Sequence, residues 1–563
     1  MRLGVRRLAY NDGELLPGDP SLPPPAPRPF EADAHGLRPA GRRPAIPGGG
    51  PQSAAAVLDG VLAQEPGREA LVGRHGRLSY AALDNAANRA AQALASLGVR
   101  AGDRVAACLP NDLDLVVAFL GCMRMGAIWV GVNRALAPPE QAYLLRDSGA
   151  AVLLAAPDPA RALAEQRRTL PGLAHAVVVD PGGAADEWRA RLDAAAGATR
   201  PVVAIDPFAP AAIAYTSGTS GHPKGAVHSQ HNLLLPGSVS RETGRYPAGV
   251  RLGAVLPLTI LNLVILGPLT AFQLGTACVA IDRVDPEGLA EWIRRERVGS
   301  FAGVPTILHD LLMHPGVRPA DLASLVAPEV GGAECPEEFR ALYRERFGRE
   351  VRVGYGMTEA PTAVAWTDGS PASAPGHCGR AQPQIEIAIL GEGDRPLPPG
   401  EVGEICIGPA RTGAWAGVYT PMLGYWDRPD ASAEALRGGR YHSGDLGLVD
   451  EAGNLSIRGR RGELILRGGA NVYPAEVECL IQAIPGVAAC ADFGIPEARL
   501  GQRVVAAVEL LPGVEHDPEA ILAQLRPQLA RYKLPERIAI VPALPRNAMR
   551  KVLKRDLAAL FNG

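Results

Sequence analysis

The stretch Tyr215-Thr216-Ser217-Gly218-Thr219-Ser220-Gly221-His222-Pro223-Lys224-Gly225 directly follows the apolar residues 211–214. Its eleven residues include three glycines, four serine or threonine hydroxyls and one lysine. Glycines adopt positive φ angles and let backbone N–H groups approach an anion closely. Hydroxyls donate hydrogen bonds to phosphate oxygens, and lysine adds a positive charge. The stretch therefore predicts a strand that leads into a phosphate-binding loop.

Two other interpretations of this loop are weaker. A Walker A loop needs the order Gly-x-x-x-x-Gly-Lys-Ser/Thr, which is absent here because Pro223 precedes the lysine. A flexible Gly/Ser linker rarely carries an ordered Thr/Ser/Gly/Lys pattern behind an apolar strand. The order of residues instead resembles the signature loop of the adenylate-forming superfamily, which includes acyl-CoA synthetases, luciferases and the adenylation domains of peptide synthetases.

The composition indicates a globular enzyme with more than one domain. With 563 residues the chain is too long for one compact core. A net charge of −2 does not suggest a nucleic-acid or anionic-membrane partner. The eight cysteines form no Cys-x-x-Cys pair, and the N-terminal residues contain no apolar signal-peptide core. We therefore expect free thiols and a cytoplasmic location.

Residues 252–281 carry no charged side chain, which superficially suggests a membrane span. Pro257, Asn262, Pro268 and several glycines interrupt this run. We interpret it as a buried strand, loop and helix inside an α/β core, with a transmembrane helix as the alternative.

Strand and helix patterns alternate along the chain after residues 1–50, a segment rich in Pro, Gly and Arg that we interpret as a flexible extension. Ser79 is placed to cap a helix that ends near Leu97. This alternation predicts parallel sheets joined by right-handed crossovers. The other predicted elements before residue 200 are strands at 104–109, 128–132, 151–155 and 176–180 and a helix at 113–125.

A second, smaller α/β pattern follows a boundary near residues 459–462. Pro474 suits the first turn of its first helix. The predicted elements are strands at 463–466, 504–511 and 537–541 and helices at 474–484 and 518–529.

The resemblance to the adenylate-forming superfamily covers roughly residues 52–560, because further superfamily motifs follow in the expected order. Gly354-Tyr355-Gly356-Met357-Thr358-Glu359 resembles the aromatic-Gly-x-Thr-Glu motif. Gly331-Gly332-Ala333-Glu334 resembles the segment on the other side of the adenine. The resemblance implies that Tyr355 stacks on adenine and that Glu359, with Thr216, holds Mg²⁺, a cation that prefers oxygen ligands. Considered alone, Tyr355 would be a core aromatic residue and Glu359 a surface carboxylate.

Tyr441-His442-Ser443-Gly444-Asp445-Leu446 resembles the Thr/Ser-Gly-Asp motif of the superfamily. A carboxylate can accept hydrogen bonds from both ribose hydroxyls, so the resemblance assigns Asp445 to the ribose, with Arg460 beside it. An isolated Asp or Arg would more often be a turn residue or a surface charge. The implied adenine- and ribose-binding residues are Gly332, Ala333, Glu334, Gly354, Tyr355, Thr358, Asp445 and Arg460.

Only four of the 57 basic residues are lysines: Lys224, Lys533, Lys551 and Lys554. The resemblance assigns Lys224 to the departing pyrophosphate. Leu544-Pro545-Arg546-Asn547-Ala548-Met549-Arg550-Lys551 resembles the motif of the catalytic lysine, so Lys551 is the implied catalytic residue. A mobile ammonium there would lower the repulsion between a carboxylate and an α-phosphate. Lys533 also falls at a superfamily position, with its role open, and we interpret Lys554 as a solvated lysine at a helix start.

Gly468-Gly469-Ala470-Asn471-Val472-Tyr473-Pro474 resembles the glycine loop that lines the thiol channel of relatives, where backbone passes close to pantetheine. An ordinary hairpin turn is the alternative. Gly462 occupies the hinge position, where relatives usually have Asp or Lys, and glycine can absorb large φ/ψ changes. Arg550 stands where glycine is usual before the catalytic lysine.

The pair Thr259-Ile260 stands where many relatives have an aromatic-His pair after Pro-Leu. Ile260 also lies in the region where amino-acid-activating relatives place an aspartate, so an α-amino acid substrate is not expected. We expect an uncharged, largely apolar pocket for an aliphatic or aromatic acid. The implied pocket residues are Thr259, Ile260, Leu263, Val304, Gly331, Gly356 and Met357.

The resemblance implies an ATP-dependent carboxylic acid:CoA ligase that forms acyl-AMP and pyrophosphate, and then acyl-CoA and AMP. Its implied cofactors and substrates are ATP, Mg²⁺, CoA and the acid, with a homodimer left open. The implied fold is a large N-terminal domain, residues 51–459, of parallel sheets layered with helices plus a small β-barrel. A small mobile α+β C-terminal domain, residues 460–563, would rotate about Gly462.

Two alternatives stay open at this point. A stand-alone adenylating enzyme would load the thiol of a carrier protein instead of CoA. A nucleotide-binding homologue with impaired catalysis would explain Arg550 and Gly462. Carboxylate-dependent exchange of pyrophosphate into ATP separates this second alternative from an active enzyme.

Overall fold

The structure is a computed structural model that describes residues 37, 43–183, 186–216, 223–332, 335, 337–348, 350–361, 363–368, 376–467, 470–497, 501–546 and 552–561. Within those residues the strands form sheets of thirteen, seven and five strands. The fold class is therefore the expected α/β arrangement.

The seven-stranded sheet has the strand order β18-β8-β7-β4-β3-β5-β6. Its strands from β7 to β6 run parallel, whereas β8 and β18 are antiparallel additions at one edge. The four strands predicted between residues 104 and 180 are confirmed apart from their ends. The strands are β3 (Arg104–Cys108), β4 (Ile128–Gly131), β5 (Val152–Ala155), β6 (His175–Val178), β7 (Pro210–Thr216), β8 (Lys224–Ser229) and β18 (Gly424–Tyr425).

Several of the helices around this sheet begin at capping residues that the sequence displays. The Ser79 side chain accepts a hydrogen bond of 3.2 Å from the N–H of Ala82 and caps α2 (Tyr80–Ser96). Asp112 caps α3 (Leu113–Arg124) in a similar way. Both predicted helices are confirmed. Further helices are α1 (Asp59–Leu62), α4 (Pro138–Ser148), α5 (Pro157–Glu165), α6 (Glu187–Ala194) and α7 (Gln230–Glu242).

The thirteen-stranded sheet is parallel in one half and antiparallel in the other. Strands β1, β10, β9, β11, β12 and β13 run parallel in that order. Their bounds are β1 (Glu69–Gly73), β9 (Leu252–Ala254), β10 (Cys278–Ala280), β11 (Ser300–Gly303), β12 (Glu329–Gly331) and β13 (Arg352–Tyr355). Helices α10 (Pro286–Glu296), α11 (Pro305–Met313) and α12 (Glu337–Phe347) alternate with them.

The antiparallel half of this sheet lies where a separate small β-barrel was expected, and the barrel is not confirmed. The strands continue the row of β13 through hydrogen bonds, in the order β14-β15-β20-β19-β17-β16, and β2 (Gly76–Ser79) closes the opposite end. Their bounds are β14 (Ala365–Trp366), β15 (His377–Ala381), β16 (Ile385–Leu390), β17 (Gly403–Pro409), β19 (Tyr441–Val449) and β20 (Asn454–Arg460). Helix α13 (Pro429–Ala435) precedes β19.

Residues 252–281 form a buried strand, loop and helix, as predicted. After β9 the chain passes through α8 (Leu261–Val264), a π-helical turn (Ile265–Leu269) and α9 (Thr270–Gln273) before β10. Among the helices of the described residues, none combines the length and the apolar character that a membrane span requires.

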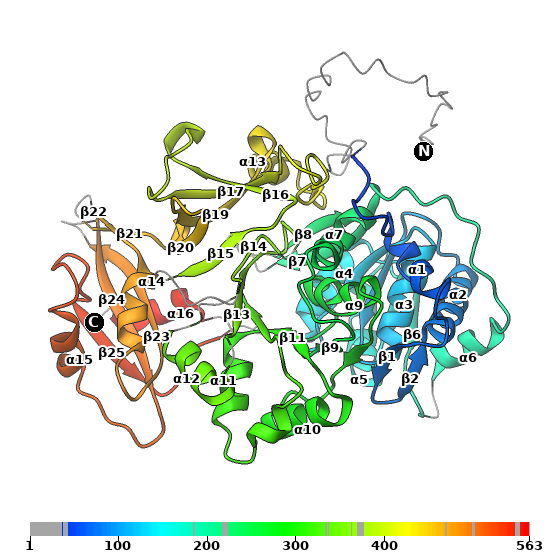
Figure 1. The fold of residues 1–563 in the computed structure, drawn as a ribbon, viewed down its shortest axis with the longest axis horizontal. Helices are drawn as coiled ribbons and strands as arrows, with labels where there is room; N and C mark the ends of the chain where they lie inside the picture. Colours follow the sequence, from blue (N-terminus) through cyan, green and yellow to red (C-terminus); the bar gives the residue numbers. More distant parts are fainter. Residues whose placement is uncertain are drawn as a thin grey trace.

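The five-stranded sheet occupies the C-terminal end of the chain. In Figure 1 its strands lie at the opposite end of the molecule from α1, α2 and α3. The sequence predicted three of its strands but missed β22 (Ala470–Val472) and the long edge strand β23 (Val487–Glu497). The other elements are β21 (Ile465–Arg467), β24 (Gly501–Leu510), β25 (Arg537–Val541), α14 (Pro474–Gln482), α15 (Pro518–Leu525) and α16 (Lys554–Leu557).

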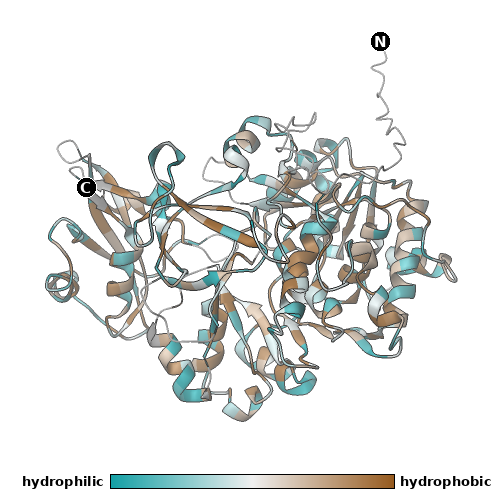
Figure 2. Ribbon diagram, turned by 45° about the horizontal axis from the view of Figure 1, so that its top comes forward, coloured by the Kyte–Doolittle hydropathy of each residue, from teal (hydrophilic) through white to brown (hydrophobic). Residues whose placement is uncertain are grey.

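One apolar core joins the two larger sheets. Its buried side chains come from both of them, for example Ala107 and Ala212 from one and Ala254 and Ile405 from the other. Figure 2 shows apolar residues concentrated on these inner strands, with polar residues on the outer helices. The predicted flexible extension contributes Ile46 to this core at its described end, since that side chain is only 2% exposed.

Candidate active site

The predicted phosphate loop lies between strands β7 and β8 in the sequence. Strands β7 and β8 are antiparallel, and Thr216 lies opposite Lys224 in the register. These two residues therefore form the base of the loop, with 3.5 Å between Thr216 Oγ1 and the Lys224 carbonyl oxygen. The predicted contacts of Ser217, Gly218, Thr219, Ser220 and Gly221 lie outside the described residues.

Helix α4 anchors both ends of this loop. The Tyr215 hydroxyl donates a hydrogen bond of 2.8 Å to Asp147 Oδ2, and the Tyr143 hydroxyl donates one of 3.1 Å to the Pro223 carbonyl. Arg428 pairs with Asp147 at 2.7 Å. Burial raises the pKa of Tyr215, so its hydroxyl keeps the proton that it donates. The hairpin is thus fixed at its base.

Lys224 and Glu359 contact the same tyrosine, one at its ring and the other at its hydroxyl. The Lys224 ammonium lies 5.3 Å from the centroid of the Tyr425 ring, and the Tyr425 hydroxyl donates a hydrogen bond of 3.0 Å to Glu359 Oε1. The main chain of Glu359 is also held, because its carbonyl accepts a hydrogen bond of 2.8 Å from Met422. The two residues predicted to act on the triphosphate are therefore close together.

The Glu359 carboxylate suits a Mg²⁺ ion. Burial raises its pKa, and within the described residues no Lys, Arg or His side chain forms an ion pair with it. A partly buried carboxylate without a cationic partner is a favourable ligand for a hard divalent cation. Together with Thr216, Glu359 would hold Mg²⁺ at the base of the loop.

His228 ties the segment that carries Glu359 to strand β8. Its Nε2 lies 2.7 Å from the Thr358 carbonyl oxygen, so Nε2 carries the proton that it donates. The side chain is fully buried, and burial lowers its pKa to about 4. His228 is consequently neutral near pH 7, and Thr358 contributes its carbonyl to the scaffold of the site.

Three predicted glycine and aromatic positions lie at the carboxyl ends of parallel strands. Gly331 at the end of β12 stands opposite Gly354 in β13, and Tyr355 follows. A Cβ on Gly354 would lie 2.5 Å from the Trp366 ring, so that position requires glycine. Carboxyl ends of parallel strands are the usual place for ligand sites in open α/β sheets. Gly332 follows with φ +76, whereas Ala333 and Glu334 lie outside the described residues.

Tyr355, Asp445 and Arg460 form one connected group. The Tyr355 hydroxyl donates a hydrogen bond of 2.7 Å to Asp445 Oδ2, and Arg460 Nε lies 3.3 Å from Asp445 Oδ1. Asp445 and Arg460 are directly opposite each other in the pairing of β19 with β20. The sequence predicted all three residues for the nucleoside but did not predict the hydrogen bond between the tyrosine and the carboxylate.

A buried trio, Glu404, Cys406 and His442, supports the turn that carries Asp445. His442 Nδ1 lies 3.2 Å from Glu404 Oε2 and 3.3 Å from the Cys406 sulfur, a donor set that a metal ion would accept. Arg437 and Arg461 also approach the same glutamate oxygen, at 3.3 and 3.5 Å, and their charges oppose a bound cation. The other Glu404 oxygen accepts a hydrogen bond of 3.1 Å from the Gly444 N–H, next to Asp445.

The predicted acyl-pocket residues fall on four segments, at or after the ends of the neighbouring strands β9, β11, β12 (Gly331) and β13. Thr259 is 4% exposed, and its hydroxyl has no hydrogen-bond partner among the described residues. Its backbone packs on Gly131 at the end of β4 and leaves no room there for a Cβ. Ile260 and Leu263 follow at the start of α8, Val304 precedes α11, and Gly356 and Met357 follow β13.

The structure describes only some of the site residues that were predicted in the C-terminal part of the chain. Lys551, Arg550, Gly468 and Gly469 lie outside the described residues. Gly462 sits in a short turn (Arg461–Glu463) between β20 and β21. Lys533 pairs with Glu476 at 2.6 Å.

The interpretation of Lys554 as a solvated lysine is wrong. Its ammonium lies 2.8 Å from Glu478 and 3.2 Å from Glu463, and its side chain is only 20% exposed. These two carboxylates raise its pKa in spite of the burial. Lys554 therefore joins α16 to α14 and to the turn that contains Gly462.

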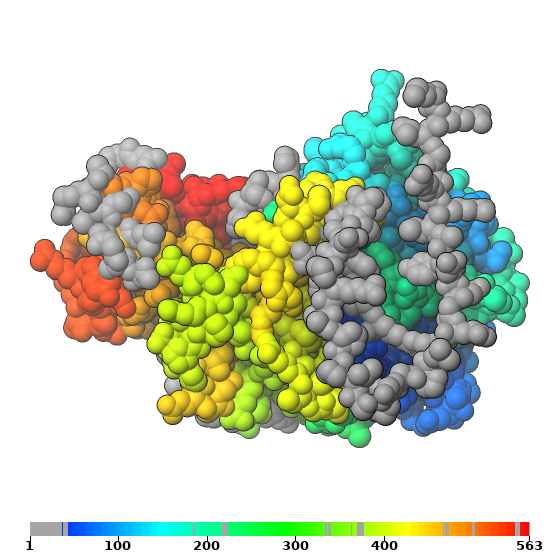
Figure 3. All heavy atoms as spheres, turned by 90° about the horizontal axis from the view of Figure 1, so that it is seen from above, coloured from blue at the N-terminus to red at the C-terminus, as the bar shows by residue number. Residues whose placement is uncertain are grey.

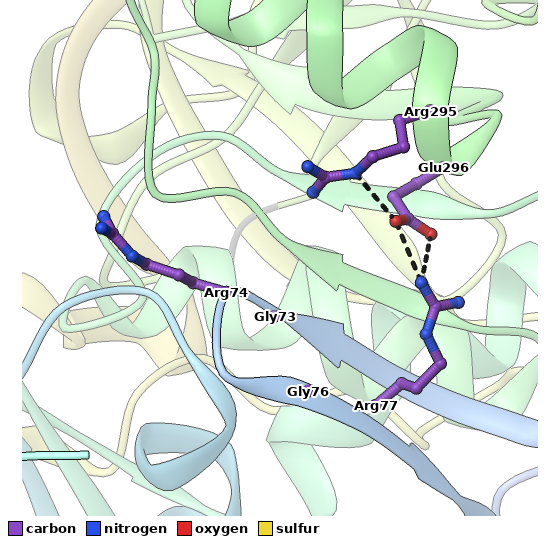
Figure 4. A pocket seen from close by; sticks show the side chains of 6 residues that line it. All are labelled: Gly73, Arg74, Gly76, Arg77, Arg295 and Glu296. Atoms are coloured by element: carbon purple, nitrogen blue, oxygen red, sulfur yellow. Dashed lines mark hydrogen bonds and ion pairs between the residues drawn. The ribbon is translucent and has the colours of Figure 1, made fainter. Parts of the chain in front are cut away.

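A surface pocket of about 390 Å³ lies away from this site, between the β1–β2 hairpin and the end of α10. Figure 4 shows Arg77 and Arg295 both directed at Glu296, with Arg74 extending away from them. Arg74 pairs with Asp282 at 3.1 Å. Because each arginine already has a carboxylate partner, this pocket is an ion-pair cluster and a poor anion site.

The sequence did not predict four residues of the site: Tyr425, His228, Asp147 and Glu404. The available signal for His228 was the polar run His228-Ser229-Gln230-His231-Asn232 directly behind Ala226-Val227. Every residue of that run is buried, and each side chain bonds to backbone, four of them to segments far away in sequence.

Comparisons with known proteins agree with this arrangement. The model of the AMP-binding enzyme family matches residues 58–426, and that of the AMP-binding enzyme C-terminal domain matches residues 476–551. The feruloyl-CoA synthase of Amycolatopsis sp is 34% identical over 501 residues, which cover 87% of this chain and 95% of that protein. The fatty acid–[acyl-carrier-protein] ligase ScoC of Streptomyces coeruleorubidus is 33% identical over 512 residues, 89% of this chain and 94% of that protein.

Among solved structures, ATP-bound MatB from Rhodopseudomonas palustris superposes with a TM-score of 0.80 at 29% identity. The match covers 90% of this chain and 99% of that chain. The chain therefore belongs to the AMP-binding enzyme family, that is, to the adenylate-forming enzymes. Within this class it is an AMP-forming acyl-CoA synthetase, an ATP-dependent acid–thiol ligase.

Proposed function

We propose that this acyl-CoA synthetase activates an uncharged aliphatic or aromatic carboxylic acid and transfers its acyl group to CoA. The uncharged side chains of Thr259, Ile260, Leu263, Val304 and Met357 support this class of acid. Leu263 and Met357 pack against the large apolar core, and Val304 against a second apolar cluster. The names of two relatives, a feruloyl-CoA synthase and a fatty acid ligase, cover an aromatic and an aliphatic acid.

In the first half-reaction a carboxylate oxygen of the acid attacks the α-phosphorus of ATP. The acyl–phosphate bond forms and the bond to pyrophosphate breaks. Lys224 would neutralise the departing pyrophosphate, and Lys551 would bridge the two reacting anions. Bound Mg²⁺, held by Glu359 and Thr216, would supply charge neutralisation on the phosphate oxygens.

One observation carries this assignment. Lys224, Tyr425 and Glu359 form one contact series, and Tyr355, Asp445 and Arg460 form a second. Tyr355 ends β13 and Glu359 follows it in the same segment, so the two groups are neighbours. A triphosphate-binding group beside a nucleoside-binding group is the arrangement that ATP requires.

In the second half-reaction the thiol of CoA attacks the acyl carbon, so that the thioester forms and AMP leaves. We propose that residues 460–563 rotate about Gly462 as a mobile domain on residues 51–459. This would withdraw Lys551 and bring Gly468 and Gly469 toward the thiol channel. A Cβ on Gly462 would meet no atom within 4 Å, which supports an open, adaptable backbone there. We also propose a cytoplasmic location, where ATP and CoA are available.

The experiment is a pyrophosphate-release assay with short, medium, long and aromatic carboxylic acids, followed by a thiol-acceptor comparison. We expect one class of uncharged acid to release pyrophosphate and CoA to consume the adenylate. Release only with an α-amino acid or a dicarboxylic acid would contradict the proposed pocket. A carrier protein is the second candidate acceptor, because ScoC is named for one, and thioester formation on a carrier protein but not on CoA would establish it. No release and no pyrophosphate exchange with any acid would indicate an impaired homologue.

A further inference from the structure

Tyr425 occupies a rigid position at the edge of the seven-stranded sheet. It lies opposite Ala226 of β8, and its own N–H donates a hydrogen bond of 2.8 Å to Ser432 Oγ. On either side, Leu423 and Trp426 donate hydrogen bonds of 2.8 Å to carbonyls of β8. The side chain is buried, with 7% of the residue exposed. In Figure 3 the chain that leads to β18 (yellow) crosses the middle of one face of the molecule.

This one side chain contacts two oppositely charged groups through different atoms. The face of its ring receives the Lys224 ammonium, and its hydroxyl donates to the Glu359 carboxylate. A cation is attracted to the face of an aromatic ring, and a carboxylate is stabilised by a hydroxyl donor. A tyrosine hydroxyl is protonated near neutral pH, so it remains a donor.

Lys224 and Glu359 carry opposite charges and would attract each other. Within the described residues they form no ion pair, and Lys224 makes none with any other carboxylate. A direct pair would neutralise both groups and take away the cation for pyrophosphate and the carboxylate for the metal. The tyrosine offers each charge a separate partner.

We propose that Tyr425 is a positioning residue that holds Lys224 and Glu359 apart and directs each toward its own end of the triphosphate. Its ring positions the ammonium, and its hydroxyl positions the carboxylate. This inference rests on the proposed roles of Lys224 and Glu359. It predicts that the two contacts of Tyr425 can be removed one after the other with different consequences.

Tyr425→Phe removes the hydroxyl and keeps the ring. We expect the Mg²⁺ concentration for half-maximal pyrophosphate–ATP exchange to rise at least about tenfold, the fold-change of one hydrogen bond to a charged group, with the KM for pyrophosphate unchanged. Calorimetric binding of Mg²⁺ with ATP gives a readout apart from turnover, and its affinity should fall by the same factor. Tyr425→Leu removes both contacts and should also raise the KM for pyrophosphate several-fold.

Tyr419→Phe is the matched control. Tyr419 lies in the same segment, is 1% exposed, and its hydroxyl has no hydrogen-bond partner among the described residues. This variant should match the wild type in both assays, and Tyr425→Phe should share its melting temperature. Equal behaviour of Tyr425→Phe and Tyr419→Phe would overturn the inference.

Lys224→Ala and Glu359→Gln separate this inference from the proposed function. Both should strongly reduce exchange. If they do and Tyr425→Phe has no effect on Mg²⁺ binding, only the role of Tyr425 is refuted. If neither variant changes exchange, the assignment of the site itself fails, and the role of Tyr425 fails with it.

Discussion

The Tyr355 hydroxyl donates a hydrogen bond of 2.7 Å to the Asp445 carboxylate, across 90 residues of sequence. The same carboxylate pairs with Arg460 at 3.3 Å. The hydroxyl of the predicted adenine-stacking residue therefore orients the predicted ribose-binding residue.

Tyr355→Phe should keep the stacking surface and lose the support of Asp445. We expect the KM for ATP to rise at least about tenfold with little change in kcat, since a hydrogen bond to a charged group contributes roughly 1.5–3 kcal/mol. Steady-state kinetics at varied ATP concentration measures this. Tyr532→Phe, at a residue that is 43% exposed, is the control. An unchanged KM in Tyr355→Phe would mean that Asp445 does not depend on this contact.

Lys551→Ala should abolish adenylate formation and largely spare thioester formation from supplied acyl-AMP. The reason is that a cation near the α-phosphate is needed only while two anions approach each other. The two half-reactions are measured separately, by pyrophosphate exchange and by consumption of acyl-AMP with CoA. Equal loss of both would argue against a rotating C-terminal domain.

His228 should make the chain less stable in acid. Its folded-state pKa is about 4, below the ordinary value of 6.5, so the unfolded chain takes up a proton that the folded chain does not. The contribution of neutral His228 to the free energy of unfolding, about 3 kcal/mol, is present above pH 6.5 and lost as the pH falls toward 4. Denaturant unfolding of the wild type and of His228→Gln at several pH values tests this. The variant should show a flatter pH dependence, and equal slopes would contradict the prediction.

Asp492 should have the opposite effect. This carboxyl group is fully buried in β23, and neither oxygen has a hydrogen-bond partner among the described residues. Burial and the nearby Glu478 raise its pKa, so its protonated form is compatible with folding and stability falls as the pH rises through the folded-state pKa.

Asp492→Val should therefore raise the free energy of unfolding by about 1–3 kcal/mol at pH 8, with a smaller gain in acid. Thermal and denaturant unfolding at both pH values measures the difference. Asp158→Ala, whose side chain is 86% exposed, should change little and serves as the control. A loss of stability in Asp492→Val at pH 8 would show that the carboxyl group has a partner that favours its charged form.

The local sequence was sufficient to predict many of the helices and strands and the order of the motifs. Ser79 and the periodic residues behind it predict α2, and the apolar runs predict β3, β4 and β5, because caps and hydrophobic period act within a few residues. The loop at residues 215–225 predicts phosphate binding because glycines, hydroxyls and lysine are adjacent in the chain. Edge strand β23 escaped prediction because it contains Asp492 and Gly494 within an irregular pattern.

The pairings inside the site depended on the tertiary structure alone. Tyr425 reaches Glu359 across 66 residues, and Arg428 reaches Asp147 across 281, because strand register and helix packing bring those side chains together. Nothing near Lys554 in the sequence indicates that Glu463 and Glu478 neutralise it. Residue types and their spacing therefore predict the kind of ligand and reaction, because the residues of each motif are close together in the sequence. Which charge meets which partner follows from contacts between distant segments, and these exist only after the sheets have formed around their shared core.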